Sequence, residues 1–409
     1  MDSRPEAPFE RSRSGQSCPT GGLGRPGLTP SARGGGSIDA VAVHRFLPDL
    51  DGVSRVTLTT LAPASLTAAF WLGLGAHGWR IVDFLAVRSG ATALLHGLSP
   101  YDDSRRAVLA SQHLVYPPLT GYLFVPFAVL PTRLAIVLYL VLSIAAVALA
   151  LRLLEVSDWR CYAVVALWQP FFLGLIDGVL SPLLVLALAA VWRWRDRIGV
   201  AVVVAAAIVA KLFLWPLLLW LVATRRWRLA AAAGAATLLG LCIPFLGLGA
   251  NVAWSYVKLI GEEERIFGGT SFSTTALFHA LGLSRSSSHA ALLCLAFVGE
   301  AAIVVLARRP DGDRRSFVAA IAAALLLSPI VWSHYFILLL VPIALRSRTF
   351  SGLWLVPIGL WGVGSASLGS IWRLVFVLVV VLPVLLTTVR GSSRAQPVLS
   401  AEQVAASAS

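Results

Sequence analysis

Residues 134–151 of this chain read LAIVLYLVLSIAAVALAL and contain no charged side chain. The hydrocarbon core of a bilayer requires about 20 predominantly apolar residues in an α-helix that crosses it. This stretch therefore predicts a transmembrane helix. Transmembrane β-barrels show short segments of alternating hydrophobicity instead, and this run does not alternate.

The composition extends that prediction to the whole chain. Of the 409 residues, 57% are hydrophobic and only 13% are charged, whereas soluble domains contain about 25% charged residues. Surface-to-volume scaling prevents a soluble protein of this size from burying so much apolar surface. The sequence therefore predicts an all-α polytopic membrane protein with 10 to 12 transmembrane helices. The apolar runs cover residues 58–78, 119–130, 134–153, 161–176, 179–192, 198–222, 229–248, 290–306, 317–327, 331–345, 353–368 and 375–388.

The charge of the chain predicts its domains and orientation. The formal charge is +13, and an excess of arginine in a membrane protein normally lies in cytoplasmic loops and tails. Residues 1–55 are basic and rich in Gly, Pro and Ser, which indicates a disordered cytoplasmic tail. Residues 56–390 are predicted to form the membrane domain and residues 391–409 a second tail. Nucleic acid is not a predicted partner. The four scattered cysteines indicate neither zinc nor a disulfide, and no cofactor is predicted.

A polar island from Trp79 to Pro118 follows the first apolar run and is therefore expected outside the cytoplasm. Gly97 and Pro100 interrupt it, which favours short interfacial helices and turns. A second polar segment, residues 249–275, is expected to be a loop. Its three consecutive glutamates, 262–264, are most simply interpreted as a solvated face.

The positive-inside rule gives a conflict around the run Ile198–Val222. Arginine clusters at 193–197 and 225–228 both look cytoplasmic, yet one continuous helix between them would put them on opposite sides. Either the run is a broken hairpin between Lys211 and Pro216, or one cluster lies outside. Pro216 favours the break, and a broken segment at membrane depth must line a cavity or be buried in protein.

Three residues are candidates for chemistry. Asp83 is a carboxylate among apolar neighbours, where a raised pKa would suit a general base; an ion pair with Arg80 or a helix cap would also explain it. Lys211 lies inside an apolar run and would bind a phosphate, or its side chain would extend to an interface. His334 would hydrogen-bond a phosphate or hydroxyl, or pack between helices. Asp177, at a glycine-containing break, is interpreted as a helix cap.

Several segments together resemble the GT-C type of integral-membrane glycosyltransferase, specifically glycosyltransferase family 87. That family includes polyprenyl-phosphomannose-dependent α-1,2-mannosyltransferases. One departure concerns a Gly-Gln pair that members often carry, where this chain has Asp177-Gly178. The segments that carry the resemblance are Val82-Asp83-Phe84, Leu94–Tyr101, Tyr116–Leu119 with Pro126, Lys211 and Pro216 ahead of Arg225–Arg228, and Ser328–Tyr335.

The resemblance implies a GT-C-type helical bundle with an extracytoplasmic first loop. It implies transfer of a sugar, most simply mannose, from a polyprenyl-phosphate donor in the membrane lipid to a glycan or glycolipid hydroxyl. Asp83 would be the base, with inversion at the anomeric carbon, as the base works in inverting glycosidases. His334 and Lys211 would bind the donor phosphate. Arg80, Tyr101, Tyr116 and Trp332 are further candidates, and no carboxylate cluster indicates a metal, although the metal requirement stays open.

Two alternatives remain at this point. A glycosyltransferase using an arabinofuranosyl or glucosyl lipid donor would share these features. A transporter or flippase of lipid-linked sugars would share the many spans and the intramembrane charge. Transporters usually contain internal repeats, and the sequence shows none.

Overall fold

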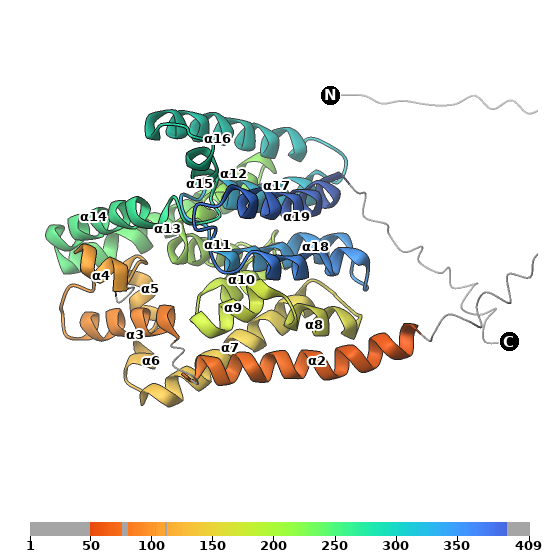
Figure 1. Ribbon diagram of the computed structural model, residues 1–409. Coiled ribbons are helices and arrows are strands. Elements are labelled where there is room, and N and C mark those ends of the chain that lie inside the picture. Colours follow the sequence, from red (N-terminus) through yellow and green to blue (C-terminus); the bar gives the residue numbers. More distant parts are fainter. Residues whose placement is uncertain (1–49, 76–80, 103, 111–112, 391–409) are drawn as a thin grey trace, which may run out of the picture. The chain divides into compact units, whose positions relative to one another are not determined.

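The computed structural model describes residues 50–75, 81–102, 104–110 and 113–390. The predicted tails, residues 1–49 and 391–409, and the candidate Arg80 lie outside these ranges. Within them every regular element is an α-helix or a 3₁₀ helix, and there is no strand (Figure 1). The all-α prediction is confirmed. The first helix begins at Leu50, and its apolar part that is long enough to cross a membrane begins at Arg55. The boundary between tail and membrane domain at residue 56 stays a prediction.

Five of the described helices are long and apolar enough to cross a membrane. A sixth candidate is a pair of helices bent by 58° at a short break. The protein is therefore a polytopic membrane protein. The five are α2 (Leu50–Gly73), α7 (Thr132–Leu153), α13 (Trp227–Leu248), α16 (Arg285–Ala307) and α19 (Ile371–Arg390), and the bent pair is α8 (Trp159–Ala166) with α9 (Gln169–Asp177).

The other apolar runs form shorter helices, each below the length that a crossing needs. The number of 10 to 12 crossings stays a prediction, because it counted such runs as full spans. The shorter elements are α10 (Ser181–Arg193), α11 (Val200–Ala210), the 3₁₀ helix η2 (Leu212–Leu214) with α12 (Pro216–Ala223), α17 (Gly312–Leu327), η3 (Ser333–Leu339) with α18 (Leu340–Arg346), and η4 (Gly352–Trp354) with η5 (Val356–Gly362).

The run Ile198–Val222 is broken where the sequence predicted. α11 ends at Ala210, and Lys211 has an extended backbone with φ −148° and ψ 99°. α12 then begins at Pro216, whose missing N–H is harmless in the first turn of a helix. The chain thus changes direction at Lys211 instead of crossing as one helix.

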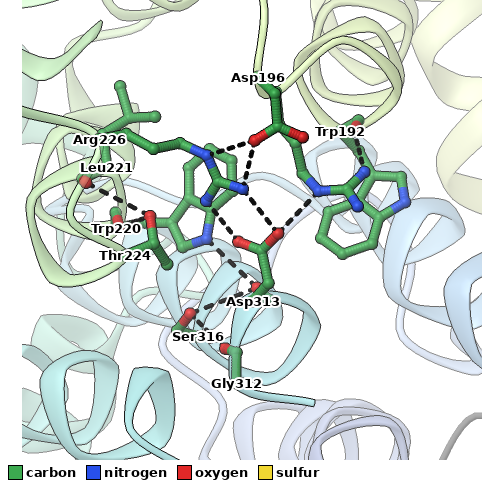
Figure 2. Close-up of polar contacts among 10 residues, drawn as sticks. Trp192, Asp196, Trp220, Leu221, Thr224, Arg226, Gly312, Asp313 and Ser316 are labelled. Atoms are coloured by element: carbon green, nitrogen blue, oxygen red, sulfur yellow. Dashed lines mark hydrogen bonds and ion pairs between the residues drawn. The ribbon is translucent and has the colours of Figure 1, made fainter. Parts of the chain in front are cut away.

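Arginines from both clusters form ion pairs with the same carboxylate, that of Asp313 (Figure 2). Arg195 binds the Asp313 carboxylate over 2.7 Å, and Arg226 binds the same carboxylate over 2.6 Å. Arg226 also contacts Asp196, and the Trp220 indole donates to the backbone oxygen of Asp313. Because both clusters meet one carboxylate at the start of α17, they lie at the same end of the helices. The hypothesis that one cluster lies on the opposite side is wrong.

The described part of the polar island forms short helices, as predicted: α3 (Val82–Leu95) and α4 (Arg105–Ala110). The apolar run 119–130 after it forms two more, α5 (Pro118–Leu123) and α6 (Val125–Ala128). The second polar segment is not a loop. It folds into α14 (Ala250–Phe267) followed by α15 (Thr274–Ala280). α14 packs against α4 and α13, and α3 packs against α5 and α6 (Figure 1). α3, residues 113–117 and α14 all contribute to one site.

Candidate active site

A pocket with a volume of about 470 Å³ lies among these helices. Small-molecule sites are typically about 300–1,000 Å³. Its walls come from α3, the segment before α5, the end of α9, the break after α11, α14 and the segment around η3. Residues far apart in the sequence are brought together here, and they include Asp83, Lys211 and His334.

Asp83 lies in the first turn of α3, where the helix dipole favours a negative charge. Its side chain is partly buried and lines the pocket. Burial raises the pKa of Asp83 to about 6, and the nearby Lys211 charge offsets part of that rise. The helix cap is Ile81, with no side-chain cap bond, so the interpretation of Asp83 as a cap is wrong. The alternative ion pair with Arg80 falls outside the described residues.

Lys211 presents its charged end to the pocket. Its Nζ donates to the Tyr335 hydroxyl over 2.6 Å and lies 4.6 Å from the centroids of the Tyr116 and Tyr335 rings. The Tyr335 ring in turn stacks on Phe213 at 5.2 Å. A cation between two aromatic faces is attracted by both. These contacts hold the ammonium group against aromatic side chains at the pocket. The alternative that Lys211 extends to a membrane interface stays a prediction.

Two residues that line the same pocket each have a buried polar atom without a hydrogen-bond partner among the described residues. These atoms are Nε2 of His334 and the hydroxyl of Tyr116. Burial, with Asp83 nearby, raises the pKa of Tyr116, so its hydroxyl keeps its proton and can donate. Buried polar groups normally have partners, and these two are placed to bind a polar ligand.

The remaining candidates occupy different positions. Trp332 lines the pocket and packs edge-on against Phe267. Tyr101 is not among the lining residues. Its hydroxyl donates to the backbone oxygen of Tyr116 over 2.9 Å, and its ring packs on Tyr256. Tyr101 therefore supports the pocket wall from behind.

Asp177 is the last residue of α9 and lines the pocket. The interpretation of Asp177 as a cap is wrong, because the N-cap of the next helix is Leu180. Gly178 after it has φ +68°, and a Cβ there would lie 2.3 Å from a side-chain carbon of Ile81. Only glycine permits this approach of α9 to α3, which brings Asp177 and Asp83 to one pocket.

Sequence reasoning missed three residues of this site. Tyr335 directly follows His334 in a segment that carries the family resemblance, so its position was a usable signal. His113 and Glu263 form a buried pair with Nε2 and Oε1 2.7 Å apart. The interpretation of 262–264 as a solvated face is wrong for Glu263. No local signal links residues 150 positions apart, and the pair was not predictable without the fold.

The pocket combines two kinds of polar group. Asp83, Asp177 and Glu263 contribute carboxylates, while Lys211, His334 and the tyrosine hydroxyls contribute donors. In the described part of the chain, no group of three or more His, Cys, Asp and Glu side chains is arranged to hold a metal ion. This set of groups can remove a proton and stabilise an anion.

Comparisons with known proteins agree with this chemistry. The sequence model of glycosyltransferase family 87 matches residues 114–333, more than half of the chain. A polyprenol-phosphate-mannose-dependent alpha-(1-2)-phosphatidylinositol pentamannoside mannosyltransferase of Mycolicibacterium smegmatis is 26% identical over 354 residues, 80% of each chain. A protein of the same name from Mycobacterium tuberculosis is 27% identical over 320 residues, 71% of this chain and 68% of its own. No solved structure matches the chain.

Proposed function

Because the chain belongs to glycosyltransferase family 87, and is thus a membrane glycosyltransferase, we propose that it transfers mannose from a polyprenyl-phosphate donor to a glycolipid hydroxyl. The names of both similar proteins specify polyprenol-phosphate-mannose and a phosphatidylinositol mannoside, which supports this donor and this class of acceptor. Inversion at the anomeric carbon and an extracytoplasmic active site are part of the proposal.

The observation that carries the proposal is that Asp83 and Lys211 face one pocket. A lipid-linked sugar leaves a phosphate monoester, which needs a cation or hydrogen-bond donor beside it. Lys211 and His334 supply these groups. An acceptor hydroxyl has a high pKa and needs a base as it attacks, and Asp83 supplies that base.

In the proposed reaction the sugar passes from the donor phosphate to the acceptor oxygen. The acceptor oxygen forms a bond to the anomeric carbon, from the face opposite the phosphate. The bond between that carbon and the phosphate oxygen breaks, and its electron pair leaves with polyprenyl phosphate. The hydroxyl proton passes to the Asp83 carboxylate. Attack from the opposite face gives inversion.

The charge distribution supports an active site outside the cytoplasm. Arg195 and Arg226 meet at Asp313, and Arg348 pairs with Glu155 over 2.6 Å. α10 and α11 run between the Asp313 cluster and the pocket, because α10 ends at Arg193 while α11 ends beside Lys211. With arginine-rich loops inside, the pocket opens toward the other face.

A transfer assay tests the proposal. Purified protein receives polyprenyl phosphates that carry radiolabelled mannose, arabinofuranose or glucose, together with a phosphatidylinositol mannoside acceptor. We expect label transfer from the mannose donor, with a new linkage of opposite anomeric configuration, and loss of transfer in Asp83→Asn. Near wild-type turnover of folded Asp83→Asn would refute the role of Asp83. Transfer from another donor alone would refute the choice of mannose.

Orientation is tested by labelling single cysteines in a cysteine-free background. Ser286→Cys lies in an exposed position at the start of α16, and Arg197→Cys in the exposed loop after α10. A membrane-impermeant thiol reagent applied to intact cells should label position 286 only. Labelling of position 197 alone would reverse the proposed orientation.

A further inference from the structure

The His113–Glu263 pair has no role in the step described above, yet it is buried and lines the pocket. The His113 side chain is 2% exposed and that of Glu263 is 14% exposed. His113 lies in the first loop, whereas Glu263 lies on α14. A buried pair of ionisable groups from two separate segments requires an explanation beyond surface solvation.

The hydrogen bonds of His113 fix its ring. Nδ1 lies 3.2 Å from the backbone oxygen of Ala107 and donates its proton to it. Nε2 and Oε1 of Glu263 share a second proton over 2.7 Å. The imidazole therefore holds one carboxylate oxygen in place. In functional sites a supporting residue often fixes the orientation of the side chain that binds the substrate. Here His113 is the supporting residue and Glu263 is the side chain that it orients.

The second carboxylate oxygen of Glu263 makes no hydrogen bond or ion pair with the described residues. An ionised carboxylate can accept several hydrogen bonds, and Glu263 belongs to the wall of the pocket. It lies close enough to Asp83 to raise the pKa of that carboxyl group. Glu263 is thus a fixed acceptor in the pocket, near the proposed base.

The negative charge of Glu263 decides which part of the substrates it can bind. A carboxylate repels a phosphate, and Lys211 and His334 provide the donors that a phosphate needs. A sugar hydroxyl, in contrast, donates well to a carboxylate. We propose that Glu263, oriented by His113, binds a hydroxyl of the acceptor sugar and so holds the neighbouring attacking hydroxyl toward Asp83. This inference rests on the proposed function and assigns the acceptor as a polyhydroxylated sugar.

Substitutions at Glu263 separate binding of a hydroxyl from support of the fold. Glu263→Gln keeps an oxygen for the His113 bond but replaces the free acceptor atom with an NH₂ group. Glu263→Ala removes both. Loss of a hydrogen bond to a charged group typically costs about 1.5–3 kcal/mol, which is roughly 10-fold or more in affinity. Glu262→Gln, on the same helix but outside the pocket lining, is the matched control.

The experiment measures KM for a phosphatidylinositol mannoside acceptor and for the polyprenyl-phosphate-mannose donor, with thermal stability alongside. We expect Glu263→Gln and Glu263→Ala to raise the acceptor KM about 10-fold or more and to leave the donor KM within about twofold. Glu262→Gln should match the wild type. His113→Ala should raise the acceptor KM as well, because Glu263 loses its orientation.

Each outcome separates the inference from the proposed function. If wild-type protein transfers no sugar, the proposed function fails and this inference fails with it. If the wild type is active but Glu263→Gln has an unchanged acceptor KM, the inference alone is overturned and the pair is structural. An equal rise in donor and acceptor KM would also overturn it, because a general distortion of the pocket would then explain the loss.

Discussion

The pH dependence of sugar transfer tests the role of Asp83 most directly. A general base works only as the carboxylate, so its raised pKa moves the loss of activity to higher pH. Burial raises the pKa of Asp83 from 3.8 to about 6. The rate should therefore fall as the pH drops through about 6, and should be constant well above that value. If Asp83 had the ordinary pKa of 3.8, the rate of transfer would stay nearly constant as the pH drops through about 6.

The size of the effect follows from that pKa. At pH 7.5 about 97% of Asp83 is ionised, and at pH 5 about 9% is, if its pKa is about 6. We expect kcat/KM for the donor, measured at saturating acceptor, to fall roughly tenfold between these two pH values. With a pKa of 3.8, more than about 90% would stay ionised at pH 5. The two cases are distinguishable in an assay of ordinary precision.

Two neighbouring charges shift the pKa of Asp83 in opposite directions. Lys211 lowers the pKa of Asp83 and Glu263 raises it. Lys211→Met should therefore move the acidic midpoint of the kcat/KM profile upward, and Glu263→Gln should move it downward. Melting temperatures at pH 5 and 7.5 control for acid unfolding. A flat wild-type profile, or midpoints that move in the same direction in both variants, would refute the assignment of Asp83 as the titrating base.

Three further substitutions probe the scaffold. Asp313→Asn should destabilise the protein by about 1–3 kcal/mol, because two arginines lose their shared carboxylate; thermal melting should show a smaller loss for the exposed Asp196→Asn. Gly178→Ala should abolish most transfer by displacing the helix that carries the base, whereas Gly97→Ala, also at φ +68° but with open space around it, should cost far less in the same assay. Tyr335→Phe should raise the donor KM several-fold with a smaller change in acceptor KM, and equal changes would contradict its role beside the cation.

The sequence was informative where a local pattern determines the structure. The uncharged run at 134–151 forms α7, and the conflict between two arginine clusters correctly required a break near Lys211. The motifs of the family also predict that Asp83 and His334 share one site, and both line the pocket. Local pattern and motif order therefore predict the helical class and place Asp83 and His334 in the site.

What the sequence did not reveal depends on contacts between distant segments. Three glutamates in a row have no period that distinguishes a pocket wall from a solvated face, so Glu263 was misassigned. Its partner His113 comes from the segment between α4 and α5, and neither residue has a recognisable motif. Asp177 looked like a cap because a glycine follows it, although that glycine instead permits the close approach of α3.

α11 and α12 form a hairpin because the helix breaks at Lys211. This hairpin keeps both arginine clusters at one end and places Lys211 at the pocket. α11 has 11 residues, which at 1.5 Å each span about 16 Å, or about half of a hydrocarbon core of about 30 Å. The Asp313 cluster lies at the base of the hairpin. With this arginine-rich end at the membrane surface, as we propose, the tip carries Lys211 to about half depth. A bare charge there costs a few kcal/mol. The Tyr335 hydroxyl and two tyrosine faces offset part of that cost, and an anionic ligand in the pocket would offset more. A continuous helix would carry the residues after Lys211 away from the pocket and would separate the arginine clusters. The broken helix is therefore the arrangement that puts a cation within reach of a lipid-linked phosphate.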